Sequence, residues 1–423
     1  MARLAWCAAL VVGWTACGAV VQRPTEGPCA QPSARDWLDK ASKSLVFRQF
    51  SPAGPAYDQH HRAAVAVTMG RVAAGAQAVL SYPYPQRFAG ADAGFAELAN
   101  RSFVYDDALA LVWAAERGEV LLARGLAHTL AGLQLPDGSW GFSFAVFGDG
   151  FYNAGYVRAG TVAWAVYALA HYQQRTGDTQ FAGTLERGLL WLLGQTDARG
   201  LVRAGRGRWI DGKTFDPDFD ARFAATEHQI DAWFAYGAAA AADPDLAARL
   251  HLSACRSRLA ASLDALLWRP GEERYAQGID GDKVDDHSAL DAAGSWAALL
   301  DVARDRPGRA QAALHWVQRE HAIVAHGWPG LRPYVPDPPE TWFVEGSLAV
   351  ALAWWRLGDR DAAVEAFAPA VQLACAAGVP LVYAPDWHTD FPLSPAAAPT
   401  LWFLLIGQEL YDHRPALWTE TGP

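Results

Sequence analysis

Three side chains that can exchange protons open an otherwise apolar stretch of the sequence. In "AATEHQIDAWFAYGAAAAAD", residues 224–243, Glu227, His228 and Asp231 precede a run of alanine and aromatic residues. Glu227 and Asp231 are four residues apart, so a helix places both carboxyl groups on one face. Capping accounts for an acid in a first turn, but Asp231 lies further inside, where carboxylates are rare unless paired or functional. The structural alternative is a pairing of Asp231 with His228 or Arg158.

Two further apolar segments begin with acids. Asp106 and Asp107 stand in "VYDDALALVW", and Glu345 stands in "TWFVEGSLAVALAWW". Hydrolysis of a glycosidic bond needs one carboxyl group that donates a proton and a second that activates water or attacks the anomeric carbon. We expect Glu227 to be the donor, because apolar surroundings would raise its pKa, and Asp107 or Glu345 to be the second carboxylate. The roles are interchangeable at this stage, and capping is the structural alternative for Asp106.

Aromatic side chains are frequent, with 19 Trp among 423 residues, and several stand in Gly- and Pro-rich connections. The apolar faces of sugar rings stack on indoles, while acids and amides hold the hydroxyls. Core packing is the alternative, and it is the expectation for Trp on helices such as Trp164 and Trp296. The expected carbohydrate-binding side chains are Asp106, Tyr156, Arg158, His228, Asp231, Trp140, Trp209, Trp233, Trp328, Trp342, Trp387 and His388.

The elements that must position these side chains are helices, because apolar periodicity of the helical kind dominates the chain. Short turns with Gly, Asp and Pro alternate with long connections rich in Gly, Pro and aromatic residues. Twelve helices are expected, over residues 59–80, 106–117, 119–134, 158–175, 179–195, 226–242, 245–268, 288–304, 306–321, 342–357, 361–377 and 395–411.

This alternation predicts an all-α fold, an (α/α)6 toroid in which six inner helices ring an axis and six outer helices surround them. The helices that follow the long connections are expected to be the inner ones, so their acidic N-termini would meet at one rim. An open α-solenoid is the rival arrangement. The count of twelve and the absence of a polar capping repeat in the sequence favour closure.

The motifs "YDDALAL", "TEHQIDAW", "LDAAGSWAAL", "WFVEG" and "AAAPTLWFLL" resemble those of a secreted bacterial group in the six-hairpin, glycosidase-like superfamily. The resemblance covers about residues 60–411, and Gln229 stands where the related pattern has Asn. It implies a glycan-active fold without fixing a substrate. Glycoside hydrolysis is the expected activity.

Three other functions stay open on the same fold. A polysaccharide lyase would use Tyr156, Arg158 and His228, and a sugar epimerase would use His228 or His388 as its base. A non-catalytic glycan-binding protein of an envelope or exopolysaccharide system would need the aromatic side chains without two apposed acids.

The first 17 residues carry one Arg before the apolar run Leu4–Val12 and are typical of a signal peptide. "WTAC" ends at Cys17 and resembles a lipobox, so both a lipid anchor at Cys17 and ordinary cleavage stay open. We therefore expect a secreted or periplasmic protein, or one held to the membrane by its lipid. Residues 18–45 would be a flexible leader and residues 46–414 a single toroid domain.

The net charge of −10 at pH 7, without a basic run, excludes nucleic acid as an expected partner. The five Cys are scattered, so no zinc pattern is present and neither a metal nor a cofactor is expected. The sequence carries no oligomerisation signal, and a monomer is expected.

Overall fold

The computed structural model describes residues 38, 41–49, 51–52, 75–82, 100–148, 153–210, 214–325, 328–335, 341–376 and 396–419. These residues contain 13 helices. Six helical segments form an inner ring: α5 (Val104–Glu116), α7 (Ala159–Thr176), α9 (Thr226–Ala242), α12 (Leu290–Ala293) continued by α13 (Trp296–Ala303), α15 (Val344–Leu357) and α17 (Ala397–Asp412).

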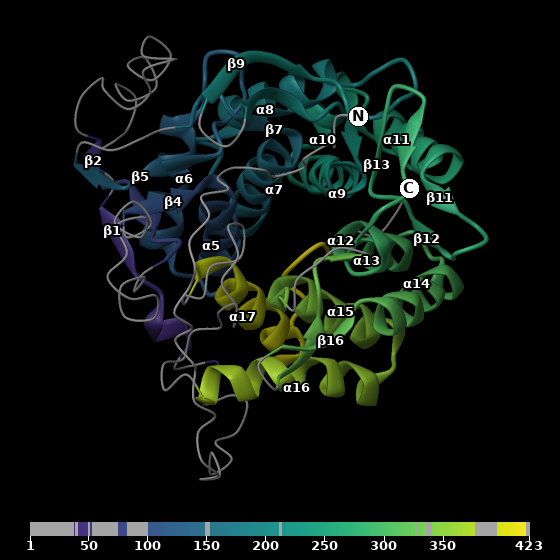
Figure 1. Ribbon diagram of the computed structural model, residues 1–423. Helices are drawn as coiled ribbons and strands as arrows, with labels where there is room; N and C mark the ends of the chain where they lie inside the picture. Colours follow the sequence, from purple (N-terminus) through teal and green to yellow (C-terminus); the bar gives the residue numbers. More distant parts are fainter. Residues whose placement is uncertain are drawn as a thin grey trace.

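The inner ring is closed. Each inner helix packs on the next one along the chain, and α17 returns to pack against α5 (Figure 1). The predicted (α/α)6 toroid is thereby confirmed and the open solenoid is excluded, since the two ends of a solenoid do not meet. Within the described ranges, no helix is both long and apolar enough to cross a membrane.

The outer helices pack on the inner helix of their own hairpin, on the side away from the axis. Left-handed glycines end two inner helices before these turns, Gly177 with φ 72° and Gly358 with φ 88°. The outer elements are α6 (Val120–Leu133), α8 (Ala182–Gly194), α10 (Pro244–Arg249), α11 (Leu252–Leu266), α14 (Pro307–Glu320) and α16 (Arg360–Ala376).

Two predicted helices are interrupted. The 245–268 helix breaks before α11, where His251 adopts a left-handed φ of 53°. The 288–304 helix breaks at Gly294, where a Cβ would lie 2.4 Å from Cγ1 of Val317 on α14. That close approach admits only glycine, so helix packing decides the break rather than local propensity.

The predicted helix at 59–80 is wrong at its end. Gln77–Val79 forms strand β3, which pairs antiparallel with β1 (Phe47–Gln49). Long-range pairing overrides the helical preference of this Ala-rich sequence. Residues 59–74 of that prediction lie outside the described residues.

The long connections form short ribbons of two or three strands at one rim of the ring. The longest hairpin, β8–β9, has a bulge between Arg206 and Arg208. The remaining strands are β2 (Ser51–Pro52), β4 (Arg101–Phe103), β5 (Ser143–Ala145), β6 (Phe147–Gly148), β7 (Val157–Arg158), β8 (Gly205–Ile210), β9 (Thr214–Ala221), β10 (Ala224–Ala225), β11 (Trp268–Arg269), β12 (Arg274–Tyr275), β13 (Gly278–Asp280), β14 (Lys283–Asp285), β15 (Ser288–Ala289), β16 (Ala322–Ala325), β17 (Trp328–Leu331) and β18 (Tyr334–Val335).

These rim connections bind the exposed N–H groups with which the inner helices begin. The first helical N–H donates to a carbonyl in the connection leading to the following inner helix, around the ring: Val104 to Phe142, Ala159 to Ala204, Thr226 to Gln277, Leu290 to Pro333 and Ala397 to Ser81. No N-cap side chain of the inner helices makes a capping bond. The N-cap residues of these helices therefore leave their first N–H groups to the rim carbonyls.

Helix α8 offers a matched test of the packing between the two rings. A Cβ on Gly188 would lie 2.7 Å from Cγ2 of Val166 and 2.9 Å from Cζ3 of Trp140, whereas a Cβ on Gly194 would meet nothing within 4 Å. We expect Gly188→Ala to lower the free energy of unfolding by about 1–3 kcal/mol through overpacking. Gly194→Ala should leave it within about 1 kcal/mol. Urea denaturation measures both, and equal effects would contradict the packing described.

Candidate active site

Two adjacent acids of α5 have different surroundings. Asp107 is fully buried, and its carboxylate accepts the Val79 N–H at 2.9 Å and the Ser102 hydroxyl at 2.7 Å. It therefore fastens β3 and the β4 segment to α5. This corrects the expectation that Asp107 is the second catalytic carboxylate, because both of its oxygens serve the fold.

Asp106, by contrast, faces the other acids of the ring. It is 4% exposed, and burial raises its pKa to about 7, although the Ser81 hydroxyl lowers it. Its charge in turn raises the pKa of Glu345 on α15. The sequence placed Asp106 in a binding role, and the structure brings it into the electrostatic reach of Glu345.

Glu345 is held by a chain of two hydrogen bonds. The Trp402 indole N–H donates to the Tyr105 hydroxyl oxygen at 2.6 Å, and that hydroxyl donates to Oε2 of Glu345 at 3.0 Å. An indole can only donate, so the single hydroxyl hydrogen of Tyr105 is directed at Glu345. Burial, followed by Asp106, raises the pKa of Glu345 to about 8, and the bond from Tyr105 lowers it.

Helix α9 contributes Glu227 and Asp231, as the sequence predicted. Burial raises the pKa of Glu227 well above its usual range, and the neighbouring charges of Asp291 and Glu345 raise it further. Burial and the charges of Glu227 and Asp291 do the same for Asp231, while contact with the Trp164 side chain acts in the opposite direction. Both shifts favour the protonated form of these groups.

Asp291 completes the group and was not among the predicted site residues. It lies in the first turn of α12, where it accepts the Ala292 N–H, and its pKa is raised by burial to about 6. The signal was present in "LDAAGSWAAL", which carries an acid in the first turn of an inner helix, as "TEHQIDAW" does.

We call Asp106, Glu227, Asp231, Asp291 and Glu345 the axial carboxyl cluster. They come from α5, α9, α12 and α15, on different sides of the ring. Low-dielectric surroundings and like charges both favour the protonated acids, and such perturbation is common at functional sites. In the described part of the chain, no group of three or more His, Cys, Asp or Glu side chains is arranged to hold a metal ion.

His228 stands beside the cluster where α7 and α9 approach most closely. A Cβ on Gly160 would lie 2.6 Å from Cδ2 of His228 and 3.0 Å from Oδ2 of Asp231, so this approach needs glycine. Burial and the charge of Arg158 lower the pKa of His228 to about 3. The imidazole is therefore neutral, which excludes the structural alternative of an ion pair between His228 and Asp231.

Arg158 serves the rim rather than a ligand. Its Nη1 donates to the carbonyls of Val157 and Arg206, both at 2.8 Å, and its Nη2 donates to the Gly207 carbonyl at 3.0 Å. The guanidinium lies 3.9 Å from the centre of the Tyr156 ring. The expectation that Arg158 binds substrate is corrected, since backbone carbonyls occupy both Nη atoms, and Tyr156 is its stacking partner.

Three of the predicted sugar-binding Trp residues are core residues. Trp140 is 0% exposed and donates to the Leu130 carbonyl, and Trp342 is 1% exposed and donates to the Ser347 hydroxyl. Trp233 is buried beneath the Arg256 guanidinium, 3.4 Å from its ring centre. These three assignments are wrong, because the indoles pack inside the protein against its own side chains and backbone.

The remaining predicted residues divide between the rim and the undescribed parts. Trp209 lies on the rim strand β8, where its ring centre is 4.9 Å from that of Phe215. Trp328 begins β17, and its side chain lies outside the description. Trp387 and His388 lie outside the described residues, as does Cys17.

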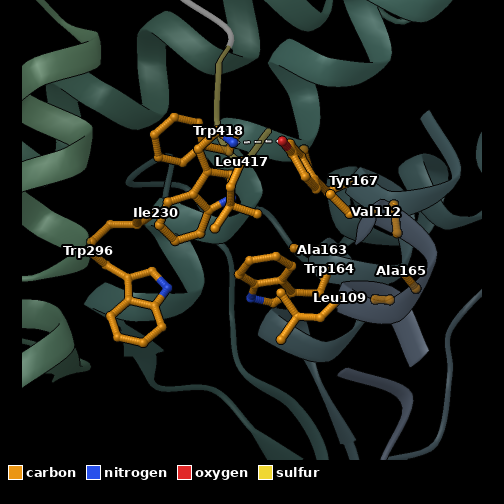
Figure 2. Close-up of a cluster of buried hydrophobic side chains, with 14 of the residues drawn as sticks. Leu109, Val112, Ala163, Trp164, Ala165, Tyr167, Ile230, Trp296, Leu417 and Trp418 are labelled. Carbon is orange, nitrogen blue, oxygen red and sulfur yellow. Dashed lines mark hydrogen bonds between the residues drawn. The ribbon is translucent and has the colours of Figure 1, made fainter. Parts of the chain in front are cut away.

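Four buried indoles lie together within the ring. We call Trp164, Trp296, Trp402 and Trp418 the axial aromatic layer; Figure 2 shows three of them. The ring centres of Trp296 and Trp402 are 5.0 Å apart, and those of Trp164 and Trp418 are 5.1 Å apart. Through Trp402 and Trp164 the layer contacts Tyr105 and Asp231 of the acidic side.

Comparisons with known proteins bear on the fold. The sequence matches no protein-family model and no curated protein. Solved structures do match. A glycosidase has a TM-score of 0.57 at 13% identity, over 84% of this chain and 96% of that one. A rhamnosidase from Klebsiella oxytoca with rhamnose bound has 0.54 at 16%, over 88% and 66%. A D-mannose isomerase has 0.54 at 12%, over 86% and 100%.

These neighbours support the predicted glycosidase-like toroid. At such low identity they establish a shared architecture, and the chemistry has to be argued from this chain's own side chains.

Asp107 can be tested as a structural residue. We expect Asp107→Ala to lower the free energy of unfolding by about 1–3 kcal/mol, because the Val79 N–H and the Ser102 hydroxyl lose a buried acceptor. Asp107→Asn, which keeps an oxygen for Val79, should lose less. Urea denaturation measures both variants. Full stability of the Ala variant would contradict the role assigned here.

The raised pKa of Glu345 predicts how the stability of the protein depends on pH. Its folded-state pKa of about 8 lies above that of an unfolded glutamate. The protein is therefore more stable at low pH, where Glu345 is protonated, and loses this stability as the pH rises toward 8. From pH 5 to pH 8, Glu345→Gln should therefore gain stability relative to the wild type by more than about 1.4 kcal/mol, one pKa unit. Glu365→Gln, which removes an exposed carboxyl from α16, controls for loss of a charge. If the difference in stability between Glu345→Gln and the wild type does not change with pH, the pKa of Glu345 is not raised and the prediction is wrong.

Proposed function

We propose that the protein is a glycoside hydrolase and that its chemistry takes place at the axial carboxyl cluster. The observation that carries the proposal is the meeting of acids from four inner-ring elements, α5, α9, α12 and α15, with different pKa values. Glycosidic hydrolysis needs one carboxyl group that holds its proton beside one that has lost it. Environments that separate pKa values in this way assign the acid and the base.

Glu227 is the proposed general acid. It is half-buried, so a substrate oxygen can reach it, and its raised pKa favours the protonated form that a general acid needs. Asp231, one turn further along α9 and only 2% exposed, is proposed to orient Glu227.

Asp291 is the proposed second carboxylate. Its pKa of about 6 lies below those of Asp106 and Glu345, because the Ala292 N–H binds the ionised form. Among the neighbouring charges, that of Asp291 raises the pKa of Glu227 most. Glu345 remains the alternative, since the directed hydroxyl of Tyr105 also favours its ionised form.

The proposed reaction consumes one water for each bond cleaved. Glu227 donates its proton to the glycosidic oxygen as the bond from the anomeric carbon to that oxygen breaks. Asp291 removes a proton from the water whose oxygen forms the new bond to the anomeric carbon, and the products are a reducing sugar and an alcohol. Direct attack by Asp291 would give the retained anomer instead, and NMR of the first product distinguishes the two courses.

Sugar release by purified protein tests the proposal. A panel of aryl glycosides and oligosaccharides is assayed for new reducing ends, with Glu227→Gln, Asp291→Asn and Glu345→Gln beside the wild type. We expect Glu227→Gln and Asp291→Asn each to reduce kcat by about 10² to 10⁴-fold. The wild-type rate should rise as the pH passes about 6, where Asp291 ionises, and fall at alkaline pH as Glu227 loses its proton.

Asp107→Asn is the matched control, because it replaces a buried carboxyl of α5 that faces away from the cluster. It should keep its activity. If Glu345→Gln abolishes release while Asp291→Asn does not, Glu345 is the second carboxylate. If the wild type binds a glycan and no variant alters release or binding, the protein is a binding protein and the hydrolase proposal fails.

A second candidate, sugar isomerisation or epimerisation, is favoured by His228. His228 lies beside Asp231 of the cluster and is neutral, as a base must be, but its pKa of about 3 has to rise when substrate binds for it to take a proton from a sugar carbon. Incubating free aldoses in deuterated water tests it. Deuterium at C2, lost in His228→Gln, would support an isomerase or epimerase and displace the hydrolase.

We also propose that the chain acts outside the cytoplasm, on the strength of the apolar run Leu4–Val12. Mass spectrometry of the protein made in a bacterial host would identify its mature N-terminus. A diacylglycerol on Cys17 would support the lipid anchor, and an intact N-terminus in the cytoplasm would oppose export.

A further inference from the structure

The segment that follows α17 returns into the ring and ends among its aromatic side chains. Ala416, Leu417 and Trp418 are each no more than 1% exposed. Trp418 stacks on Phe234 of α9, with 4.5 Å between ring centres and 3° between planes. The indole also lies 5.1 Å from Trp164, 5.8 Å from Trp402 and 6.1 Å from Trp296.

Trp418 therefore contacts side chains from four inner elements: α7, α9, α13 and α17. Figure 2 shows it between Trp296 and Tyr167. A residue in this position can transmit a displacement of any one inner helix to the other three, because packed interiors leave little room for independent movement.

Polar bonds clamp the backbone of this segment from three helices. The Trp418 N–H donates to the Tyr167 hydroxyl at 2.7 Å. Arg356 of α15 donates to the carbonyls of Leu417 and Trp418, and it is itself held by Glu409 of α17 at 2.8 and 2.9 Å. Both terminal nitrogens of the guanidinium are thus engaged in holding the segment.

The clamp holds Trp418 in an unfavourable backbone conformation. Its φ is 50°, in the left-handed region that large L-residues rarely adopt. Such a conformation costs on the order of 1 kcal/mol or more and persists where the surroundings over-determine it, often near functional sites. The strain indicates that the contacts of the indole outweigh the cost of the unfavourable backbone conformation.

Two indoles that contact Trp418 also contact the acidic side of the ring. Trp402 donates to Tyr105, which donates to Glu345. Trp164 contacts Asp231, and its ring centre lies 5.1 Å from that of Tyr105. Trp418 is therefore connected to Glu345 through Trp402 and Tyr105, and to Asp231 through Trp164.

We propose that Trp418 is a positioning residue of the axial site, which fixes Trp402 and Trp164 so that Tyr105 directs its hydroxyl hydrogen at Glu345. The inference rests on the proposed function in that it concerns the same carboxyl cluster. It goes beyond that function by assigning to the segment after α17 a part in the chemistry, which the residues touching a substrate do not reveal.

The test follows Glu345 itself and needs no substrate. Protein labelled with ¹³C at the glutamate carboxyl carbons is titrated by NMR, and Glu345→Gln identifies the signal. Asp106, Glu227, Asp291 and Tyr105 also face Glu345, so these residues stay unchanged in every variant. In Trp418→Phe, Trp402 should loosen and Tyr105 should lose its direction. The Glu345 midpoint is then expected to rise by about 0.5 pH unit or more, since the lost bond favoured the ionised form.

Trp140→Phe is the matched control. Trp140 is equally buried, but it lies between α6 and α8, away from the cluster, where its indole N–H donates to the Leu130 carbonyl. It should lose stability without moving the Glu345 midpoint. Tyr167→Phe, which removes only the acceptor of the Trp418 N–H, is the second variant in case Trp418→Phe does not fold, and it should move the midpoint upward as well.

The outcomes separate this inference from the proposed function. Unchanged midpoints in Trp418→Phe and Tyr167→Phe would overturn the inference, even in a protein that hydrolyses glycosides. Raised midpoints would support it, even if no glycoside is cleaved and the hydrolase proposal fails. In an active hydrolase, Trp418→Phe should lower kcat several-fold while KM changes less, because a displaced acid weakens the transition state more than binding.

Discussion

The ring depends on hydrogen bonds between the first N–H of an inner helix and a carbonyl in the neighbouring rim connection. Ala159 donates to Ala204, Thr226 to Gln277, and the pattern closes where Ala397 donates to Ser81. Such N–H groups otherwise need a side-chain cap or water. Because rim carbonyls accept the first of these N–H groups, the acids of the first turns are not needed as its acceptors.

The burial of these acids has an electrostatic consequence. Asp106, Glu345 and Asp291 acquire pKa values of about 7, 8 and 6, because burial penalises ionisation and, for Glu345, the charges of Asp106 and Asp291 add to it. Groups of this kind do not stabilise a fold at neutral pH. A protein that keeps them in the middle of an otherwise apolar ring departs from what stability alone would favour, and such departures concentrate at functional sites.

The axial aromatic layer connects the packed ring to the acids with raised pKa values. Its indoles fill the ring as core residues do, yet Trp402 and Trp164 also touch the groups that orient and modulate the acids. The layer thus combines packing with positioning. Within the layer, Trp418 packs against the other three indoles, and Arg356 binds its backbone carbonyl.

Local patterns in the sequence predict most of the helices, their alternating connections and the acids with which the inner helices begin, because periodicity and turn chemistry are local. Tertiary structure decided the rest. Asp106 and Asp107 are adjacent, and only the rotation of α5, fixed by the bonds of Asp107, selects which one faces the cluster. Ring closure buried Trp140 in the core and brought Asp291 and Trp418 to the site from distant segments. No local pattern encodes that closure, since it depends on contacts between residues far apart in the chain.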